Sequence, residues 1–356
     1  MIEAYLEKRF RKKLDPERIR GYCASLPMDG TGAKIADNKT LTVSCVQRRI
    51  NPVKRVARYI DMLHGFIQEA AEQNAELVVF PEYNFFDLLG LIPGFGLIDR
   101  YLNKAASKKD GNDPAGEGGD SMIAAIFGAV AGPVKNCLHT AVSALAEGFG
   151  VHIYTGSYLT KEREQLYSEG ALFGPDGRLI GTQRKLHLTD AEERMGYRRG
   201  HELLAYTVNG IKIAIPICMD ATYFETFRLA RRLGADVVVI PIANNEEYTC
   251  WRALRGIWPR VQESYVYGAK ASLNGWIAGM HFTGRAGVFG PMEMTEKRDG
   301  VFAVAPHYEG DCVITHTLDI EELRGVRDEA QYFGDGNTQF EAHYTEIYEG
   351  GPRDEE

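Results

Sequence analysis

The chain has 356 residues, of which 44% are hydrophobic and 25% are charged, as is usual for a folded globular protein. Its formal net charge of −8 argues against general nucleic-acid binding, which requires a basic surface. Six cysteines are scattered without a Cys-x-x-Cys pair, so neither a disulfide framework nor a zinc site is expected. There is no apolar run long enough to span a bilayer and no signal-peptide core in the first ten residues, which predicts a cytoplasmic protein without a transmembrane segment.

Residues 1–40 are polar and are expected to form a short helix followed by an extended arm that packs on the body. The folded domain is expected to begin at residue 41. An alternating strand at 41–47, an amphipathic helix at 53–74 and a buried strand at 76–81 come first. A strand, a helix and a strand at this spacing predict a right-handed crossover between two parallel strands.

Residues 84–137 combine apolar patches at 88–98 and 122–134 with a polar, Gly-rich break at 108–120. This pattern predicts an insertion into the domain, made of helices that flank a mobile loop. The patches are compatible with a hydrophobic entrance to a site, with contact to a membrane surface, or with packing in a dimer. Packing is the favoured interpretation, because apolar patches of this size are usually covered.

The remaining elements indicate one layered α/β domain over residues 41–330, with a mixed sheet and an extended C-terminal tail at 331–356. In chain order we expect a helix at 140–148, a strand at 151–158, a hairpin at 170–183, a strand at 211–217, a helix at 221–233, a strand at 235–241, a helix at 251–265, a strand at 266–273, a hairpin at 286–304, a strand at 313–318 and a helix at 320–327.

Three reactive side chains stand where predicted strands end. They are Glu82, Lys185 and Cys218. A thiol is mostly protonated at neutral pH, so a nearby carboxylate is needed to accept its proton, and a nearby ammonium stabilises the oxyanion that follows attack on a carbon. Taken singly, each has an ordinary explanation: a surface position for the two charged residues and a small buried core residue for the cysteine.

Together these motifs resemble the nitrilase superfamily of carbon–nitrogen hydrolases, whose catalytic Glu, Lys and Cys occur in this order. The resemblance extends from about residue 41 to about residue 320. It rests on Phe80-Pro-Glu82, Arg184-Lys-Leu-His187 and Ile217-Cys-Met-Asp220, supported by Gly284-Arg-Ala-Gly-Val-Phe-Gly-Pro291, in which Ala286 replaces the family's serine. It implies a four-layer type of α-β-β-α sandwich with mixed sheets, in which the family's members dimerise, so at least a homodimer is expected.

The resemblance also assigns roles to the residues. Glu82 would be the general base and Cys218 the nucleophile, while Lys185 and the Met219 N–H would hold the oxyanion, with no metal or organic cofactor. The family has a second glutamate after the lysine. Glu192 and Glu193 both lie in the matching segment, and counting back from Gly200 favours Glu193.

Other residues near these motifs have secondary roles. Tyr83 and Asn244 are expected to line the pocket, and His187 is expected to make a structural hydrogen bond at its edge. Asp220 and Glu225 are expected to anchor the cysteine loop and the helix that follows by capping and ion pairing.

The substrate class follows from the residues around the cysteine. Cys218-Met-Asp220 resembles the amidase-like form and not the Cys-Trp-Glu of true nitrilases, which favours hydrolysis of a small-molecule amide. The positions at which family carbamoylases carry arginine are Ala221 and Thr222 here. An N-carbamoyl amine or a nitrile remains an alternative substrate. The alternative from another class is a non-catalytic protein that binds a ligand in the same pocket.

Overall fold

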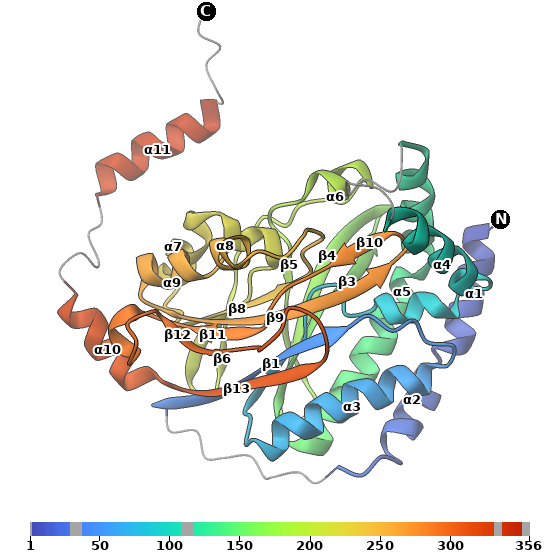
Figure 1. Ribbon diagram of the computed structural model, residues 1–356, viewed down its shortest axis with the longest axis horizontal. Coiled ribbons are helices and arrows are strands. Elements are labelled where there is room, and N and C mark those ends of the chain that lie inside the picture. The colour runs from blue at the N-terminus through green and yellow to red at the C-terminus, as the bar shows by residue number, and fades with distance from the viewer. Residues whose placement is uncertain (1, 29–37, 108–116, 331–336, 351–356) are drawn as a thin grey trace, which may run out of the picture.

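The computed structural model describes residues 2–28, 38–107, 117–330 and 337–350 (Figure 1). Strands of the described residues form a sheet in the order β5-β4-β3-β2-β1-β9-β8-β7-β6. The strands are β1 Thr40–Arg49, β2 Leu77–Val79, β3 His152–Glu162, β4 Gln165–Phe173, β5 Leu179–Arg184, β6 Ala205–Val208, β7 Ile211–Ala214, β8 Val237–Ile242, β9 Tyr267–Ile277, β10 Met280–Phe282, β11 Gly287–Phe289, β12 Val301–Val304 and β13 Cys312–Asp319.

The sheet is mixed. Its centre, from β3 to β7 through β1 and β9, is parallel, whereas β4, β5 and β6 are antiparallel to their neighbours. Strand β13 adds an antiparallel partner to β1, and β11 and β10 add to β9. Strands β1 and β2 form the parallel pair that the sequence predicts on either side of the helix at 53–74.

The sheet folds back on itself to form two layers with a core between them. Tyr154 of β3 and Ile213 of β7 come from different halves of the strand path, yet they lie in the same buried cluster. Because side chains alternate along a strand, Val239 of β8 faces this inner core while Val238 faces the helices outside. The predicted α-β-β-α sandwich is therefore confirmed.

Helices cover the outer faces of both layers (Figure 1). One layer packs α1 Ile2–Lys13, α2 Pro16–Cys23, α3 Val56–Glu72 and α5 Glu117–Phe149, and the other packs α7 Phe224–Arg232 and α9 Trp258–Ser264. The remaining helices are α4 Phe95–Ala106, α6 Asp190–Arg194, α8 Cys250–Arg255, α10 Ile320–Glu329 and α11 Thr338–Gly350, with short 3₁₀ helices η1 Phe86–Leu91, η2 Cys218–Thr222 and η3 Met292–Met294. No helix in the described residues is long and apolar enough to cross a bilayer.

The N-terminal region differs from the prediction of one short helix and an arm. Two helices form there, and Phe10, Leu14 and Ile19 are buried in the same core as α5. These helices therefore belong to the helical layer of the domain. The Gly-rich segment at 29–32 lies outside the described residues.

The region of the predicted insertion, residues 84–137, differs from the expectation in where its second helix ends. Helix α5 runs without a break from Glu117 to Phe149 and includes the separate helix expected at 140–148. Its Val130 and Leu138 are buried in the core under β3, so this part packs as a layer of the fold. Most of the expected mobile loop, residues 108–116, lies outside the described residues.

The C-terminal tail was expected to be extended, but it contains the helix α11. Glu341 of this helix accepts an ion pair from Arg228 at 3.0 Å and another from Arg232 of α7. The Tyr344 ring lies 6.4 Å from the ring of Phe224. The sequence does not reveal these contacts, because Glu341 pairs with arginines of α7, a helix that is distant in the sequence.

Candidate active site

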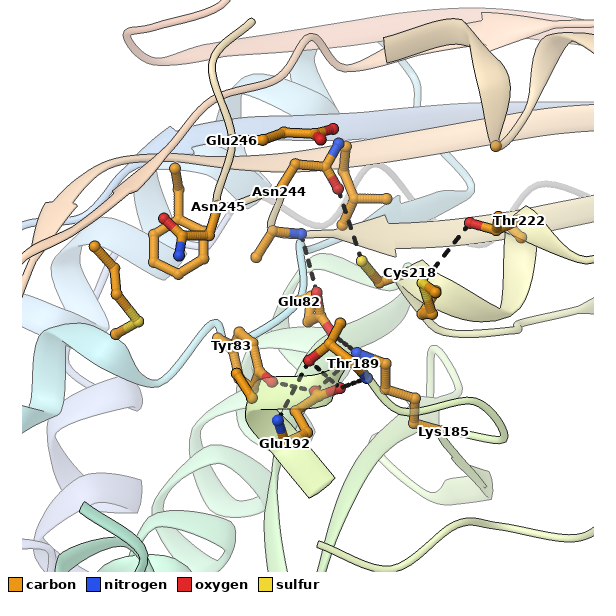
Figure 2. Close-up of a pocket in the computed structure, with 18 of the residues that line it drawn as sticks. Glu82, Tyr83, Lys185, Thr189, Glu192, Cys218, Thr222, Asn244, Asn245 and Glu246 are labelled. Carbon is orange, nitrogen blue, oxygen red and sulfur yellow. Dashed lines mark hydrogen bonds and ion pairs between the residues drawn. The ribbon is translucent and has the colours of Figure 1, made fainter. Parts of the chain in front are cut away.

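The residues at the strand ends meet in one place (Figure 2). The Lys185 Nζ atom lies 2.8 Å from Glu82 Oε1, and both side chains are 1% exposed. A second carboxylate, that of Glu192, lies 2.8 Å from the same Nζ atom. The Cys218 thiol is close enough for the Glu82 carboxylate to raise its pKa. The sequence prediction that Glu82, Lys185 and Cys218 share one neighbourhood thus agrees with the geometry.

Glu82 is held from two sides. Its other oxygen, Oε2, accepts a hydrogen bond from the Ala243 N–H at 3.0 Å, just beyond the end of β8. Strand β3 passes directly against the turn that carries Glu82. Gly156 has φ +70°, and a Cβ atom there would lie 1.9 Å from the Pro81 carbonyl oxygen, so only glycine permits this approach. Burial raises the pKa of Glu82 to about 7, although the charge of Lys185 opposes the rise.

Cys218 follows β7 with φ +47°, a left-handed conformation that is unfavourable for a residue with a Cβ atom. The Asp220 carboxylate holds this turn, because it accepts hydrogen bonds from the Ile217 N–H at 2.8 Å and from the Leu186 N–H at 3.0 Å. Asp220 therefore ties the cysteine turn to the segment that carries Lys185. The prediction that Asp220 anchors the cysteine loop is confirmed.

The charges of the site favour a neutral thiol and a permanent ammonium. Burial and the Glu82 charge raise the pKa of Cys218 well above its usual value. Burial alone would lower the pKa of Lys185, but the charges of Glu82 and Glu192 outweigh it and raise this pKa well above its usual value. The resting site therefore holds a thiol beside a carboxylate that titrates near neutral pH, as a general base should.

The second glutamate at the lysine is Glu192, and the prediction of Glu193 is wrong. Glu193 is exposed and pairs with Arg199 at the surface, whereas Glu192 is 2% exposed. Successive helical residues point about 100° apart, so only one of the two can face Lys185. The sequence holds a signal that decides between them. Thr189 and Glu192 form a capping box, with the Thr189 N–H donating to Glu192 Oε2 at 2.8 Å.

The predicted pocket residues divide into two groups. Tyr83, Met219 and Asn244 line the cavity, and the Tyr83 hydroxyl donates to the Glu192 carboxylate. Asn244 Oδ1 lies 3.8 Å from Cys218 Sγ. His187 lies outside the cavity lining, and its Nδ1 atom is 3.1 Å from Asp220 Oδ1, which is the structural hydrogen bond that was expected.

Glu225 does not contact the cysteine turn in any described interaction. Its carboxylate accepts a hydrogen bond from the Tyr348 hydroxyl of α11 at 3.0 Å. Glu225 therefore does not anchor the cysteine loop. It stands in the first turn of the helix that follows, α7, and its described partner is Tyr348 of the C-terminal helix.

The cavity at Cys218 has a volume of about 540 Å³, which is a suitable size for a small molecule. Its lining includes Met280 and an aromatic cluster, in which the Phe86 ring lies 6.3 Å from that of Phe127 and 5.9 Å from that of Phe282. In the described residues no group of three or more His, Cys, Asp or Glu side chains has a geometry that could hold a metal ion.

Comparison with known proteins identifies the family. The sequence model described as carbon-nitrogen hydrolase matches residues 42–328. The chain belongs to the carbon–nitrogen hydrolase family. A relative from Bacillus subtilis named probable hydrolase YhcX is 28% identical over 192 residues. These residues are 51% of this chain but 36% of YhcX, so the chain matches only about a third of that protein. Omega-amidase NIT2 from Xenopus tropicalis is 25% identical over 65% of this chain and 73% of its own length.

Solved structures of nitrilase-superfamily proteins share the fold of this carbon–nitrogen hydrolase. An amidase from Nesterenkonia sp. aligns with a TM-score of 0.61 at 18% identity, covering 88% of this chain and 98% of the amidase. Nit3 from Saccharomyces cerevisiae aligns with a TM-score of 0.60 at 20% identity, covering 86% of this chain and 99% of Nit3. The predicted membership of the nitrilase superfamily is confirmed.

Two polar residues of the cavity lining, Tyr197 and Lys270, were not predicted from the sequence. The Tyr197 hydroxyl is buried without a hydrogen-bond partner among the described residues, and its only signal is an aromatic residue shortly after α6. Lys270 lies within β9, in the predicted strand at 266–273. A lysine inside a strand with otherwise buried neighbours is the signal that the sequence offers there.

Proposed function

We propose that this carbon–nitrogen hydrolase cleaves the C–N bond of a small-molecule amide through a thioester on Cys218. The observation that carries the proposal is the buried Glu82 carboxylate, which lies in ion-pair contact with Lys185, adjoins the Cys218 thiol and has a pKa of about 7. A base with this pKa can accept the thiol proton and return it within one catalytic cycle.

In the first half of the reaction, Glu82 accepts the proton of Cys218 Sγ and the thiolate attacks the amide carbon. The negative charge moves to the amide oxygen, where the Lys185 ammonium and the Met219 N–H stabilise it. When the oxyanion collapses, the C–N bond breaks and the nitrogen takes the proton from Glu82. Ammonia or an amine leaves, and the acyl group remains as a thioester on Sγ.

In the second half, Glu82 accepts a proton from a water molecule, and the resulting hydroxide attacks the thioester carbon. The C–S bond breaks, the carboxylic acid leaves, and the thiolate recovers its proton from Glu82. Lys185 stays protonated because both Glu82 and Glu192 pair with it in the resting site, and the Glu192 carboxylate remains charged while Glu82 holds a proton. Glu192 therefore maintains the charge of the ammonium while Glu82 exchanges protons.

The test measures ammonia release from a panel of aliphatic amides, aromatic amides, carbamoyl amines and nitriles. The Cys218→Ser variant should lose turnover of every accepted amide, and intact-protein mass spectrometry of the wild type should detect the acyl adduct. Cys312→Ser, which removes a partly exposed thiol outside the cavity lining, is the matched control. Unchanged turnover in Cys218→Ser would overturn the mechanism. Tight ligand binding without turnover by the wild type would favour the non-catalytic alternative.

A further inference from the structure

A second lysine lines the same cavity and differs from Lys185 in its partners. Lys270 of β9 is 3% exposed, and its Nζ atom donates to the Ala253 carbonyl of α8 at 2.9 Å. The ammonium also lies 5.4 Å from the centre of the Phe289 ring. Among the described residues no carboxylate lies within ion-pair distance of Lys270, whereas Lys185 has two. Burial and the nearby positive charge of Arg285 lower the pKa of Lys270 to about 8.

A buried ammonium without a counter-ion is costly, because the charge loses its hydration and gains no opposite charge. One carbonyl and an aromatic ring offset only part of this cost. The cost is recovered if a ligand brings an anion into contact with the ammonium. Lys270 can meet such a ligand, because it lines the cavity that contains Cys218.

The other charged groups at this end of the cavity leave the positive charge uncompensated. The end is formed by α8 and the turn after it, with Ala253, Gly256 and Ile257 in the lining. Arg255 and Glu246 pair with each other at 3.3 Å. Arg252 is exposed at the same end, and its guanidinium has no acidic partner among the described residues. An anion therefore finds a net positive environment there.

The cavity lining also holds an aromatic cluster, in which the Phe86 ring packs against the rings of Phe127 and Phe282. This contrast matters for orientation. A ligand that carries a single anionic group gains an ion pair only at the α8 end, and the same group would be desolvated without compensation beside the phenylalanines.

We propose that Lys270 binds a free carboxylate of the substrate, so that the enzyme selects amides that carry a carboxylate away from the scissile bond. The inference rests on the proposed amide hydrolysis and specifies its substrate class. The carboxylate forms its ion pair with the buried ammonium, with Arg252 contributing at the mouth, and the amide carbon reaches Cys218.

The experiment compares matched amides. One member of each pair is the monoamide of a dicarboxylic acid, and the other has a methyl group in place of the carboxylate. A further pair carries the carboxylate on the amine portion of the amide. Wild-type enzyme, Lys270→Met and Lys212→Met are assayed for kcat and KM. Lys212 is exposed on β7 and outside the cavity lining, so its variant controls for the loss of a lysine.

We expect wild-type enzyme to prefer a carboxylate-bearing amide, and Lys270→Met to reduce its kcat/KM by about 30-fold or more through KM. Turnover of the neutral partner should stay within about two-fold, and Lys270→Met should melt no lower than wild type, because it removes a buried unpaired charge. The pair of amides whose discrimination is lost in Lys270→Met shows whether the acyl portion or the amine portion of the substrate carries the carboxylate. An undiminished preference in Lys270→Met, or the absence of any preference in wild type, overturns the inference.

Calorimetry with the Cys218→Ala variant separates this inference from the proposed function. Binding of the same matched amides is measured in Cys218→Ala and in Cys218→Ala with Lys270→Met. A carboxylate preference that disappears with Lys270 supports the subsite even if no amide is hydrolysed. Equal affinities for the matched amides refute it even if hydrolysis is observed.

Discussion

Replacing Glu192 by glutamine tests whether this residue, and not its neighbour, maintains the charge of Lys185. The change keeps the shape of the side chain and an acceptor for the Tyr83 hydroxyl, but it removes one of the two carboxylates at 2.8 Å from Lys185 Nζ. Removing one partner of a buried ion pair costs about 3–5 kcal/mol. Because Glu82 still pairs with the ammonium, we expect a smaller loss than this, about 2–3 kcal/mol of unfolding free energy.

The same substitution should shift the pH dependence of catalysis in a defined direction. The negative charge of Glu192 contributes to the raised pKa of Glu82, which is about 7. Without that charge the pKa of Glu82 falls. A general base works when deprotonated, above its pKa, so the acidic limb of the kcat/KM profile should move to lower pH.

Glu193→Gln is the matched control, one residue away. The Glu193 side chain is 47% exposed and pairs with Arg199 at the surface. Its removal should change the unfolding free energy by less than about 0.5 kcal/mol and leave the pH profile in place. Thermal unfolding and pH-rate profiles of the three proteins provide the measurement. Two results would refute the charge argument. One is that the two variants have the same stability and the same pH profile, and the other is that the acidic limb of the kcat/KM profile moves to higher pH in Glu192→Gln.

Two further results are expected. In wild-type enzyme kcat/KM should rise through pH of about 7 as Glu82 loses its proton. The Glu82→Gln variant, which has no base at this position, should have a kcat lower by about 100-fold or more. A flat pH profile of the wild type across neutral pH would contradict the role of Glu82 as general base. Arg48→Met should reduce the unfolding free energy by about 3–5 kcal/mol in urea titrations, because it leaves the Asp87 carboxylate buried without its cation, and a change below about 1 kcal/mol would show that the pair is dispensable.

The Glu–Lys–Cys neighbourhood was predictable because each residue stands at the end of a strand. Parallel strands present their carboxyl ends at one edge, so groups far apart in the sequence meet there. The support of these groups was not predictable in the same way. Arg48 is fully buried and donates to Asn84 Oδ1 at 2.8 Å, which fixes the loop after Glu82. An arginine at the end of a predicted strand looks solvated until the partners are known.

The helix expected to begin at residue 140 begins at Glu117 instead, and this difference has a physical source. Gly128, Gly132 and Pro133 disfavour a helix by local propensity, and they lie inside the single helix α5. Tertiary packing outweighs the propensity, because Val130 and Leu138 bury themselves against the sheet on either side of Pro133. Local propensity therefore gives no reason to join the apolar patch at 122–134 to the helix expected at 140–148, whereas the packed core makes them one helix.

Lys270 shows where a sequence contains the relevant signal but not its meaning. Ala269 and Ala271 face the core between the sheet layers, so alternation directs Lys270 to the opposite face of β9. Sequence alone leaves open whether that face meets water, a carboxylate or a cavity. The fold places it in a cavity without an acidic partner, in contrast to Lys185. Of the two buried lysines in this cavity, only Lys185 pairs with carboxylates of the described residues, and a carboxylate of the ligand is the counter-ion that we propose for Lys270.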